Sequence, residues 1–168
     1  MRSSSGLLDE LWGLLRTVPD PEIPVVSVVD LGIVRGLELV EGGAVVTITP
    51  TYSGCPAMQV IEREIIAALQ GRLEGQVTVR TVHSPPWTTD WLTDEVRARL
   101  REYGIAPPGA VAREEGELVQ LRRHRVAPPC PFCGSSETEP RSDFGSTACK
   151  ALAFCLACQQ PFELFKPI

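Results

Sequence analysis

The chain has 168 residues, of which 43% are hydrophobic and 22% are charged, and its formal net charge is −5 at pH 7. This length allows one ordinary domain with a small appendage, and the acidic balance argues against a nucleic-acid surface, which is normally basic. Only the short apolar run Leu7-Leu8 precedes Asp9, and no later segment could span a bilayer, so we expect a cytoplasmic protein without signal peptide or membrane anchor.

Hydrophobic periodicity along residues 1–108 predicts an α+β domain with the element order α-β-β-α-β-α. Ser3 to Ser5 offer N-caps for the first helix, and Pro56 suits the first position of the second. The first helix is expected to carry the apolar residues from Leu7 to Leu15 on one side, and the second to cover 57–69. A hairpin of strands at 33–40 and 44–49, a strand at 76–82, and a last helix capped by Thr89 or Asp90 and ending at Tyr103-Gly104 complete the expected elements.

Three prolines, at positions 19, 21 and 24, make a stiff loop after the first helix, and its carboxylates are expected to stay exposed. Asp20, Glu22 and Asp30 flank the start of the predicted sheet. They are candidate contacts for iron or for a partner. Loop solvation and turn capping are the alternative, and spacing alone favours that alternative.

Cys55 is the candidate reactive residue of the predicted α+β domain. If the second helix begins at Pro56, Cys55 occupies the N-cap, where free amides and the helix dipole favour a thiolate. Gly54 would allow a ligand to approach the sulfur closely. A small buried hydrophobe is the competing interpretation of a lone cysteine.

No complete catalytic constellation is present. His83 and His124 lack the companions of a metal-binding histidine motif, and Trp87 and Trp91 are interpreted as a core pair rather than a ligand-binding pair. With no nucleophile motif and no phosphate-binding loop, the sequence predicts a protein that is not a self-sufficient enzyme.

Residues 109–127 are expected to form a charged connector, with one strand at 118–121. Its end carries a basic cluster of Arg122, Arg123, His124 and Arg125. A nucleic-acid contact is one interpretation of this cluster, and a solvated linker is the favoured one.

Residues 128–168 contain two C-x-x-C pairs, Cys130/Cys133 and Cys155/Cys158, separated by residues 134–154. This is the spacing of a structural four-thiolate zinc site closed around a small β-ribbon. A module of this size folds poorly without such a metal. Disulfides, a redox dithiol and an iron–sulfur cluster remain as alternatives.

Cys149 is the unpaired cysteine of this module. It could compete as a zinc ligand, or it could be a second reactive thiol whose thiolate neighbouring Lys150 would stabilise. An inert ribbon cysteine is the other interpretation.

Several segments resemble known families. Pro19-Asp20-Pro21-Glu22-Ile23-Pro24, Val29-Asp30-Leu31-Gly32 and Thr51-Tyr52-Ser53-Gly54-Cys55-Pro56 resemble the loops of iron–sulfur assembly factors of the MIP-eighteen family. Pro86-Trp87-Thr88-Thr89-Asp90-Trp91, Gly104-Ile105-Ala106-Pro107-Pro108, both cysteine pairs and residues 144–150 resemble the PaaD (PaaJ) family of bacterial phenylacetate degradation.

The resemblance implies an accessory protein that matures or repairs the iron–sulfur or di-iron centres of phenylacetyl-CoA 1,2-epoxidase. It implies a transient iron or cluster on Cys55, with Asp20, Glu22 and Asp30 shaping its loop. The implied partners are the oxygenase subunits and the iron–sulfur assembly machinery. A structural or regulatory oxygenase subunit is the alternative. Whether the body forms a homodimer, which centre is served and which cluster type is carried all stay open.

Overall fold

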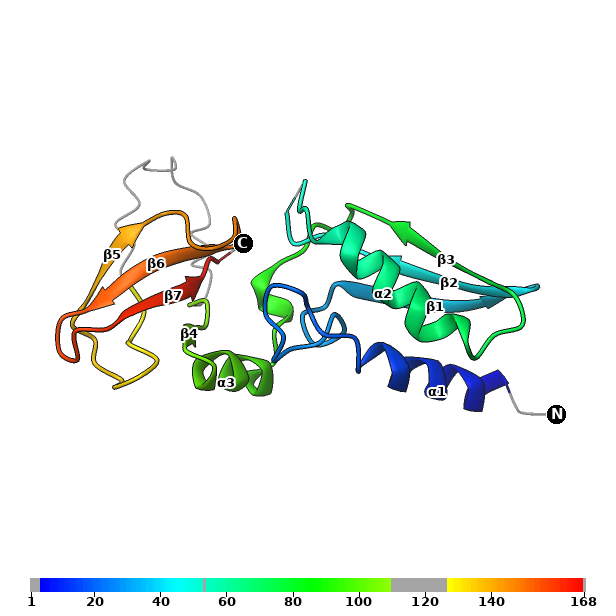
Figure 1. The fold of residues 1–168 in the computed structure, drawn as a ribbon, viewed down its shortest axis with the longest axis horizontal. Helices are drawn as coiled ribbons and strands as arrows, with labels where there is room; N and C mark the ends of the chain where they lie inside the picture. Colours follow the sequence, from blue (N-terminus) through cyan, green and yellow to red (C-terminus); the bar gives the residue numbers. More distant parts are fainter. Residues whose placement is uncertain (1–3, 53, 110–126, 168) are drawn as a thin grey trace, which may run out of the picture. The chain divides into compact units, whose positions relative to one another are not determined.

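A computed structural model describes residues 4–52, 54–109 and 127–167, and these fall into two compact units, Met1–Val96 and Arg97–Ile168 (Figure 1). The expected strand at 118–121 and the basic residues 122–125 lie outside the described ranges. The domain limits expected from the sequence, 1–108 and 128–168, stay a prediction. No helix in the described part of the chain has the length and apolar character needed to cross a membrane.

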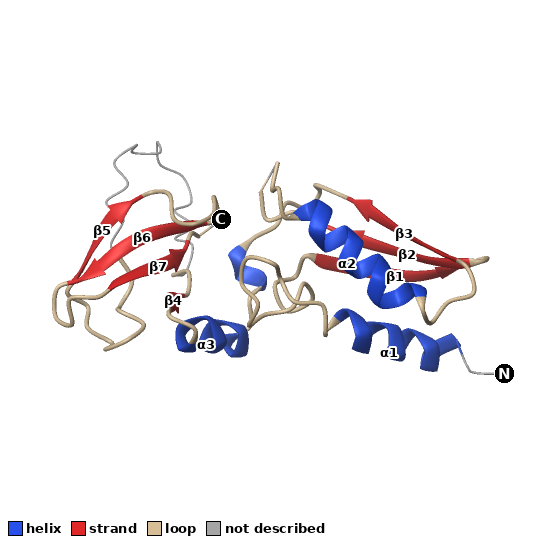
Figure 2. Cartoon of the chain, viewed as in Figure 1, coloured by secondary structure: helices blue, strands red, loops and turns tan. Residues whose placement is uncertain are grey.

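The first unit is a three-stranded sheet with two α-helices and a short 3₁₀ helix (Figure 2). Its elements are α1 (Ser4–Leu15), β1 (Val34–Val40), β2 (Gly43–Ile48), α2 (Met58–Gln70), β3 (Gln76–Thr81) and η1 (Thr89–Trp91). The strand order is β1-β2-β3, with β1 and β2 antiparallel and β2 and β3 parallel. Because parallel neighbours need a crossover, α2 lies between β2 and β3 in the sequence. The expected hairpin and third strand are confirmed.

One face of this sheet is buried, because alternate residues of β2 are apolar. Ala44, Val46 and Ile48 are at most 1% exposed. Ile61 and Ile65 of α2 are buried to the same degree. Burial of each large aliphatic side chain contributes about 1.5 to 3 kcal/mol, so the packing of α2 on the sheet stabilises the first unit.

The segment before η1 fastens the loop that leads into β1. The buried Trp87 donates a hydrogen bond from its indole Nε1 to the carbonyl oxygen of Leu31 at 2.8 Å. Trp91 is half-buried and lies under the guanidinium of Arg35, 3.7 Å from the ring centroid. The expected core role is confirmed for Trp87, whereas the ring of Trp91 packs against a cation.

Two helix starts differ from expectation. The second helix begins at Met58 rather than Pro56, and its N-cap is Ala57, because residues 56 and 57 still form a turn. Leu92 has an extended backbone, so it separates the 3₁₀ helix η1 from the last helix. The cap of that last helix is therefore Thr93, whose hydroxyl accepts from the Val96 amide at 3.3 Å, and not Thr89 or Asp90.

The second unit is a four-stranded sheet preceded by a helix. Its elements are α3 (Asp94–Glu102), which begins within the last residues of the first unit, β4 (Ile105–Ala106), β5 (Thr138–Ser142), β6 (Lys150–Cys155) and β7 (Pro161–Phe165). The strand order is β4-β7-β6-β5, with β5, β6 and β7 antiparallel and β4 parallel to β7. The predicted β-ribbon is confirmed, and β4 adds a strand to it from upstream of the connector.

Gly104 ends α3 as expected and makes the turn into β4. Its φ is +91°, a left-handed conformation that glycine adopts without strain, and a Cβ at this position would lie 3.0 Å from the ring of Phe132. The glycine therefore lets the loop with the first cysteine pair pack against the start of β4.

Replacement of Gly104 by Ala should lower the free energy of unfolding of the second unit by about 1 to 2 kcal/mol from backbone strain alone. Equilibrium denaturation of the metal-loaded protein measures this. In the Gly104→Ala protein, the further substitution Phe132→Ala removes the clash with the ring, so any steric loss of stability should be recovered while the loss from backbone strain should remain. Gly109→Ala is the matched control, since nothing lies within 4 Å of its added Cβ. A Gly104→Ala protein as stable as the control would refute the role of this turn.

Candidate metal centres

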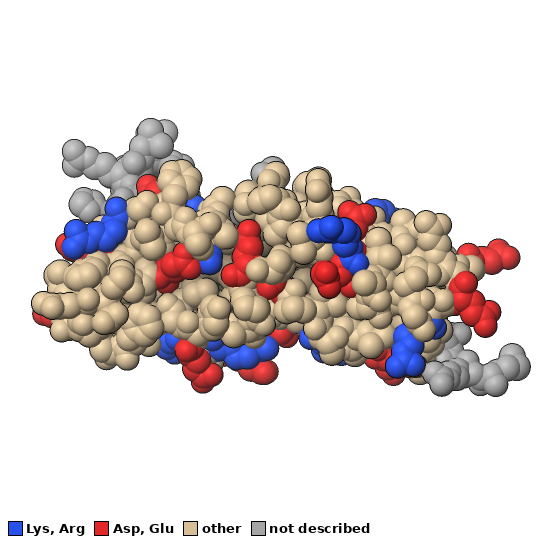
Figure 3. Space-filling model, viewed as in Figure 1, with Lys and Arg blue, Asp and Glu red and all other residues tan. Residues whose placement is uncertain are grey.

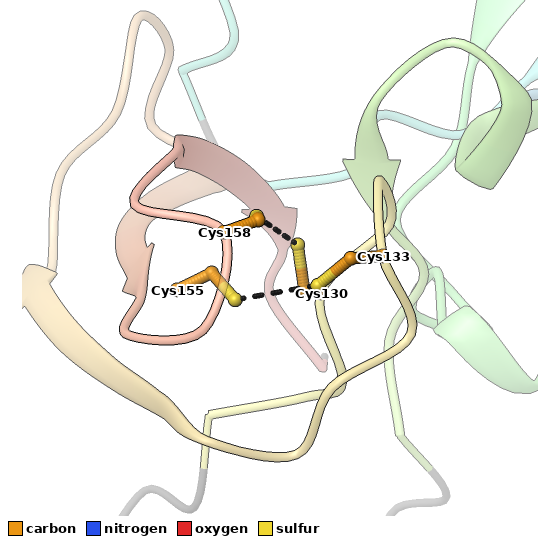
Figure 4. A group of neighbouring side chains, drawn as sticks. All are labelled: Cys130, Cys133, Cys155 and Cys158. Atoms are coloured by element: carbon orange, nitrogen blue, oxygen red, sulfur yellow. Dashed lines mark hydrogen bonds between the residues drawn. The ribbon is translucent and has the colours of Figure 1, made fainter.

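Four sulfur atoms converge in the second unit (Figure 4). Cys130 and Cys133 come from the turn before β5, Cys155 ends β6, and Cys158 lies in the turn between β6 and β7. The four Sγ atoms all lie within 4.8 Å of one another. Two of the distances are 3.7 Å, between Cys130 and Cys158, and 3.5 Å, between Cys133 and Cys155.

The two turns that carry these cysteines share one backbone geometry. In each turn the first cysteine donates its amide to the carbonyl five residues later, from Cys130 to Ser135 at 2.9 Å and from Cys155 to Gln160 at 3.0 Å. In each turn the residue just before that acceptor has a positive φ, +76° at Gly134 and +58° at Gln159. Glycine at position 134 was a visible sequence signal. Nothing in a glutamine predicts the same conformation at 159.

The cluster fits a single tetrahedral ion. Zinc–thiolate bonds of about 2.3 Å place the sulfurs of a tetrahedron about 3.8 Å apart, and the two closest pairs are 3.5 and 3.7 Å apart. These separations are too long for disulfide bonds, and no disulfide joins any of the six cysteines, all of which are described.

The thiols of the cluster do not titrate alike. The backbone amide of Cys158 lowers the pKa of Cys155 to about 7, whereas desolvation raises the pKa of Cys158 to about 12. Without an ion, Cys155 therefore loses its proton at a lower pH than Cys158 does. A cation that displaces the protons of the four thiols would be bound by four thiolates at once.

Cys149 does not belong to the cluster. Its side chain is buried, and its sulfur lies 3.1 Å from the hydroxyl oxygen of Thr147. Lys150, expected to support a Cys149 thiolate, places its ammonium 2.9 Å from the carboxylate of Glu163 instead. Cys149 lies in the turn before β6, whereas Lys150 is the first residue of β6.

Cys55 lies in the turn before α2 and not at the helix N-cap, so the helix-dipole argument for its thiolate is wrong. Its side chain is half-buried. Desolvation raises the pKa of the Cys55 thiol above its ordinary value, and the charges of Glu22 and Asp20 raise it further. Hydrogen bonds from the Ala57 amide and the Tyr52 side chain act in the opposite direction. At neutral pH this cysteine is a thiol.

The charges of two carboxylates in the proline-rich loop, Asp20 and Glu22, raise the pKa of Cys55. Asp20 is buried rather than exposed as expected, because its Oδ1 accepts from the amides of Glu22 at 2.9 Å and Ile23 at 2.8 Å. The turn is therefore capped by Asp20. Glu22 is half-buried, and its charge acts more strongly on the thiol than that of Asp20 does.

Asp30 forms two hydrogen bonds with Ser27 in the loop before β1. The carboxylate of Asp30 accepts from the Ser27 amide at 3.0 Å, and the Ser27 hydroxyl accepts from the Asp30 amide at 3.0 Å. This reciprocal pair closes the loop to which Trp87 donates its hydrogen bond.

His83 is exposed, and His124 lies outside the described residues. Over the described residues visible in Figure 3, acidic and basic side chains are interspersed, with no continuous basic surface.

Two protein-family models match the chain, one in each half of the sequence. Residues 8–81 match the model of the iron–sulfur cluster assembly protein family, and residues 114–166 match that of the PaaD zinc β-ribbon domain. The first unit is also similar to a crystal structure of a domain of unknown function, DUF59, from Bacillus anthracis. The TM-score is 0.52 at 28% identity, covering 57% of this chain and 92% of that one.

Two curated relatives have informative names. The chain is 38% identical to the Fe–S protein maturation auxiliary factor YitW of Bacillus subtilis, over 56% of this chain and 93% of that protein. It is 45% identical to a 1,2-phenylacetyl-CoA epoxidase subunit from Escherichia coli K12, over 95% of this chain and 92% of that protein. With an iron–sulfur assembly domain followed by a four-cysteine zinc ribbon, the chain belongs to the PaaD family of phenylacetyl-CoA epoxidase subunits.

Proposed function

We propose that this protein matures or repairs a metal centre, iron–sulfur or di-iron, of phenylacetyl-CoA epoxidase in the cytoplasm, and that it is not itself the catalyst of epoxidation. The observation that carries the proposal is the position of Cys55. A half-buried thiol stands within the electrostatic reach of Glu22 and Asp20, inside the segment that matches the iron–sulfur assembly family. The names of the relatives support the same system and the same task.

The chemistry of this site suits cargo that must be released. Cys55 is protonated at rest, so an arriving iron ion displaces the thiol proton and gains one sulfur ligand. The carboxylate of Glu22 offers an oxygen ligand, while buried Asp20 holds the loop. One thiolate with an oxygen ligand binds iron more weakly than a four-thiolate cage, and reprotonation of Cys55 accompanies transfer to the client protein.

The four-cysteine cluster has a different task in this proposal. Cys130, Cys133, Cys155 and Cys158 hold zinc as a closed structural site, which leaves no position for substrate. The ion supplies folding free energy to the second unit, whose buried cluster consists largely of alanine and cysteine. Cys149 takes no part in binding the ion.

A second candidate is a structural or regulatory subunit of the oxygenase. The name of the Escherichia coli relative, which calls that protein an epoxidase subunit, favours it. A maturation factor acts before turnover and is then dispensable, whereas a structural component is needed in stoichiometric amount during turnover. The two functions therefore differ in when the protein is required.

Cys155→Ser should release the zinc and unfold the second unit, because one lost thiolate opens a site that contributes roughly 10 kcal/mol to folding. Metal analysis and circular dichroism measure both effects, and helix α2 of the first unit should persist. Cys149→Ser is the matched control and should keep one equivalent of zinc. Full zinc in the Cys155→Ser protein would instead make Cys149 the fourth ligand.

Alkylation of Cys55 should be slow at neutral pH and rise with pH, because its thiol pKa is raised. Glu22→Gln removes a negative charge that disfavours the thiolate, so its alkylation profile should shift to lower pH. Tyr52→Phe removes a donor that favours the thiolate, so its profile should shift to higher pH. Peptide mapping over a pH series measures the rates. Equal profiles in all three proteins would show that these groups do not act on the sulfur.

Cells that lack the protein should assemble epoxidase deficient in iron or cluster, and Cys55→Ala should fail to restore the metal, while Cys149→Ser should restore it. Iron and sulfide analysis of the purified epoxidase measures the outcome. Epoxidase matured in the presence of the protein should then turn over without it. If metal-replete epoxidase still needs stoichiometric addition of the protein, the structural or regulatory function replaces the maturation function.

A further inference from the structure

A short turn brings Tyr52 and Cys55 together in the loop before α2. The Cys55 amide donates to the Tyr52 carbonyl oxygen at 3.3 Å, and the end residues of a four-residue turn lie within about 7 Å of one another. Gly54, the residue before Cys55, has a φ of +85°, which glycine adopts without strain. The backbone therefore holds the phenol of Tyr52 close to the thiol of Cys55.

The sulfur of Cys55 accepts two hydrogen bonds. One comes from the Tyr52 side chain and the other from the Ala57 amide. Both donors interact more strongly with a thiolate than with a thiol, because the thiolate carries the negative charge. The side chains of Tyr52 and Cys55 are both half-buried, so water competes only in part for these hydrogen bonds.

Two carboxylates act on the same sulfur with the opposite sign. The charges of Glu22 and Asp20 reach Cys55 from the proline-rich loop. A metal cation at this site would be attracted by the carboxylates and by the thiolate together. The two donors instead draw electron density out of the sulfur. The surroundings of Cys55 therefore combine groups that attract a cation with groups that weaken its sulfur ligand.

The turn leaves room beside the sulfur-bearing residue. Among the described residues, no atom outside the chain neighbours of Gly54 lies within 4 Å of a Cβ built at Gly54. Since Gly54 directly precedes Cys55, cargo can lie against the turn without displacing a side chain at this position. The expectation that Gly54 permits a close approach agrees with this open space.

Hydrogen bonds to a ligating sulfur are among the factors that set the properties of thiolate-bound metals. A neighbouring group that accepts a proton from a metal ligand makes that ligand more basic. A group that donates to the ligand has the opposite effect. A thiolate that accepts a hydrogen bond from a phenol is therefore a weaker ligand than one that does not.

We propose that Tyr52 is a positioning residue of the metal site at Cys55. Its hydroxyl holds the sulfur in place and continues to donate to the thiolate when metal is bound, so the metal–sulfur bond is weaker and the cargo leaves more readily. This role rests on the proposed function, because it requires that Cys55 binds the metal. It assigns part of the balance between holding and releasing cargo to one phenol oxygen.

The probe for this role is cobalt(II), added to the zinc-loaded full chain. A bond between cobalt(II) and a thiolate gives a charge-transfer absorption band, and zinc analysis checks that the closed four-cysteine site keeps its own ion. The unaltered chain should show the band, and the Cys55→Ala protein should lack it. Stopped-flow mixing with a chelator measures the rate of cobalt(II) release.

In the Tyr52→Phe protein the band should move to lower energy, because the sulfur regains electron density. Release of cobalt(II) should be roughly three- to tenfold slower, which is the size of the effect of one hydrogen bond. Tyr103→Phe is the matched control, since Tyr103 is the other tyrosine of the chain and lies in the second unit. It should behave like the unaltered chain. Circular dichroism establishes that each variant is folded.

An unchanged band and release rate in the Tyr52→Phe protein would overturn the proposal and leave the maturation function standing. Faster release with an unshifted band would show that Tyr52 only supports the turn, and would also overturn it. Absence of a Cys55-dependent band in the unaltered chain would overturn it together with the role of Cys55 as a ligand. If Tyr52→Phe shifts the band and slows release while cells without the protein contain metal-replete epoxidase, the role of Tyr52 stands and the maturation function fails.

Discussion

Four thiol groups within 4.8 Å of one another impose the main constraint on the second unit. As thiolates they repel one another strongly in a partly desolvated site, and as thiols they contribute only weak hydrogen bonds. A shared cation removes the repulsion and turns the same proximity into attraction. The neighbouring buried residues are small, with Phe162 the one large side chain beside Ala106, Ala127 and Ala153. Because little large apolar surface surrounds the four sulfurs, we expect the packing next to the cluster to depend on a bound ion.

The first unit depends on a different principle. Its core consists of large apolar side chains, among them Ile61 and Ile65 of α2 packed on the sheet, and its described residues contain no cluster of cysteines. Trp87 hydrogen-bonds one loop of this unit from a distant part of the sequence, and Asp20 caps another from within. The two carboxylates whose charges reach Cys55 consequently lie on a backbone that is already ordered. Such preorganisation suits the transient metal site that we propose at Cys55.

The sequence was sufficient to predict the elements whose signals are local. The hairpin, the crossover helix, the third strand and the cysteine pairs follow from periodicity and spacing. The start of α2 was misplaced by two residues because proline suits both the first helical position and a preceding turn. Turn capping by Asp20 was the favoured alternative, and its burial was missed because local sequence does not tell which parts of a loop the rest of the unit covers. The pairing of Lys150 with Glu163 joins residues on different strands, and only the register of β6 and β7 brings them together.

The short strand β4 connects the state of the metal site to the chain upstream of it. Ile105 and Ala106 pair with β7, and Ile105 is the third residue after the end of α3. Ala106 belongs to the same buried cluster as Cys130 and Cys155. Loss of the ion would loosen β7 and expose the backbone amides of β4 to solvent. Amide hydrogen exchange at these two residues would then report metal occupancy, although neither residue is a ligand and a long stretch of sequence separates them from the nearest cysteine.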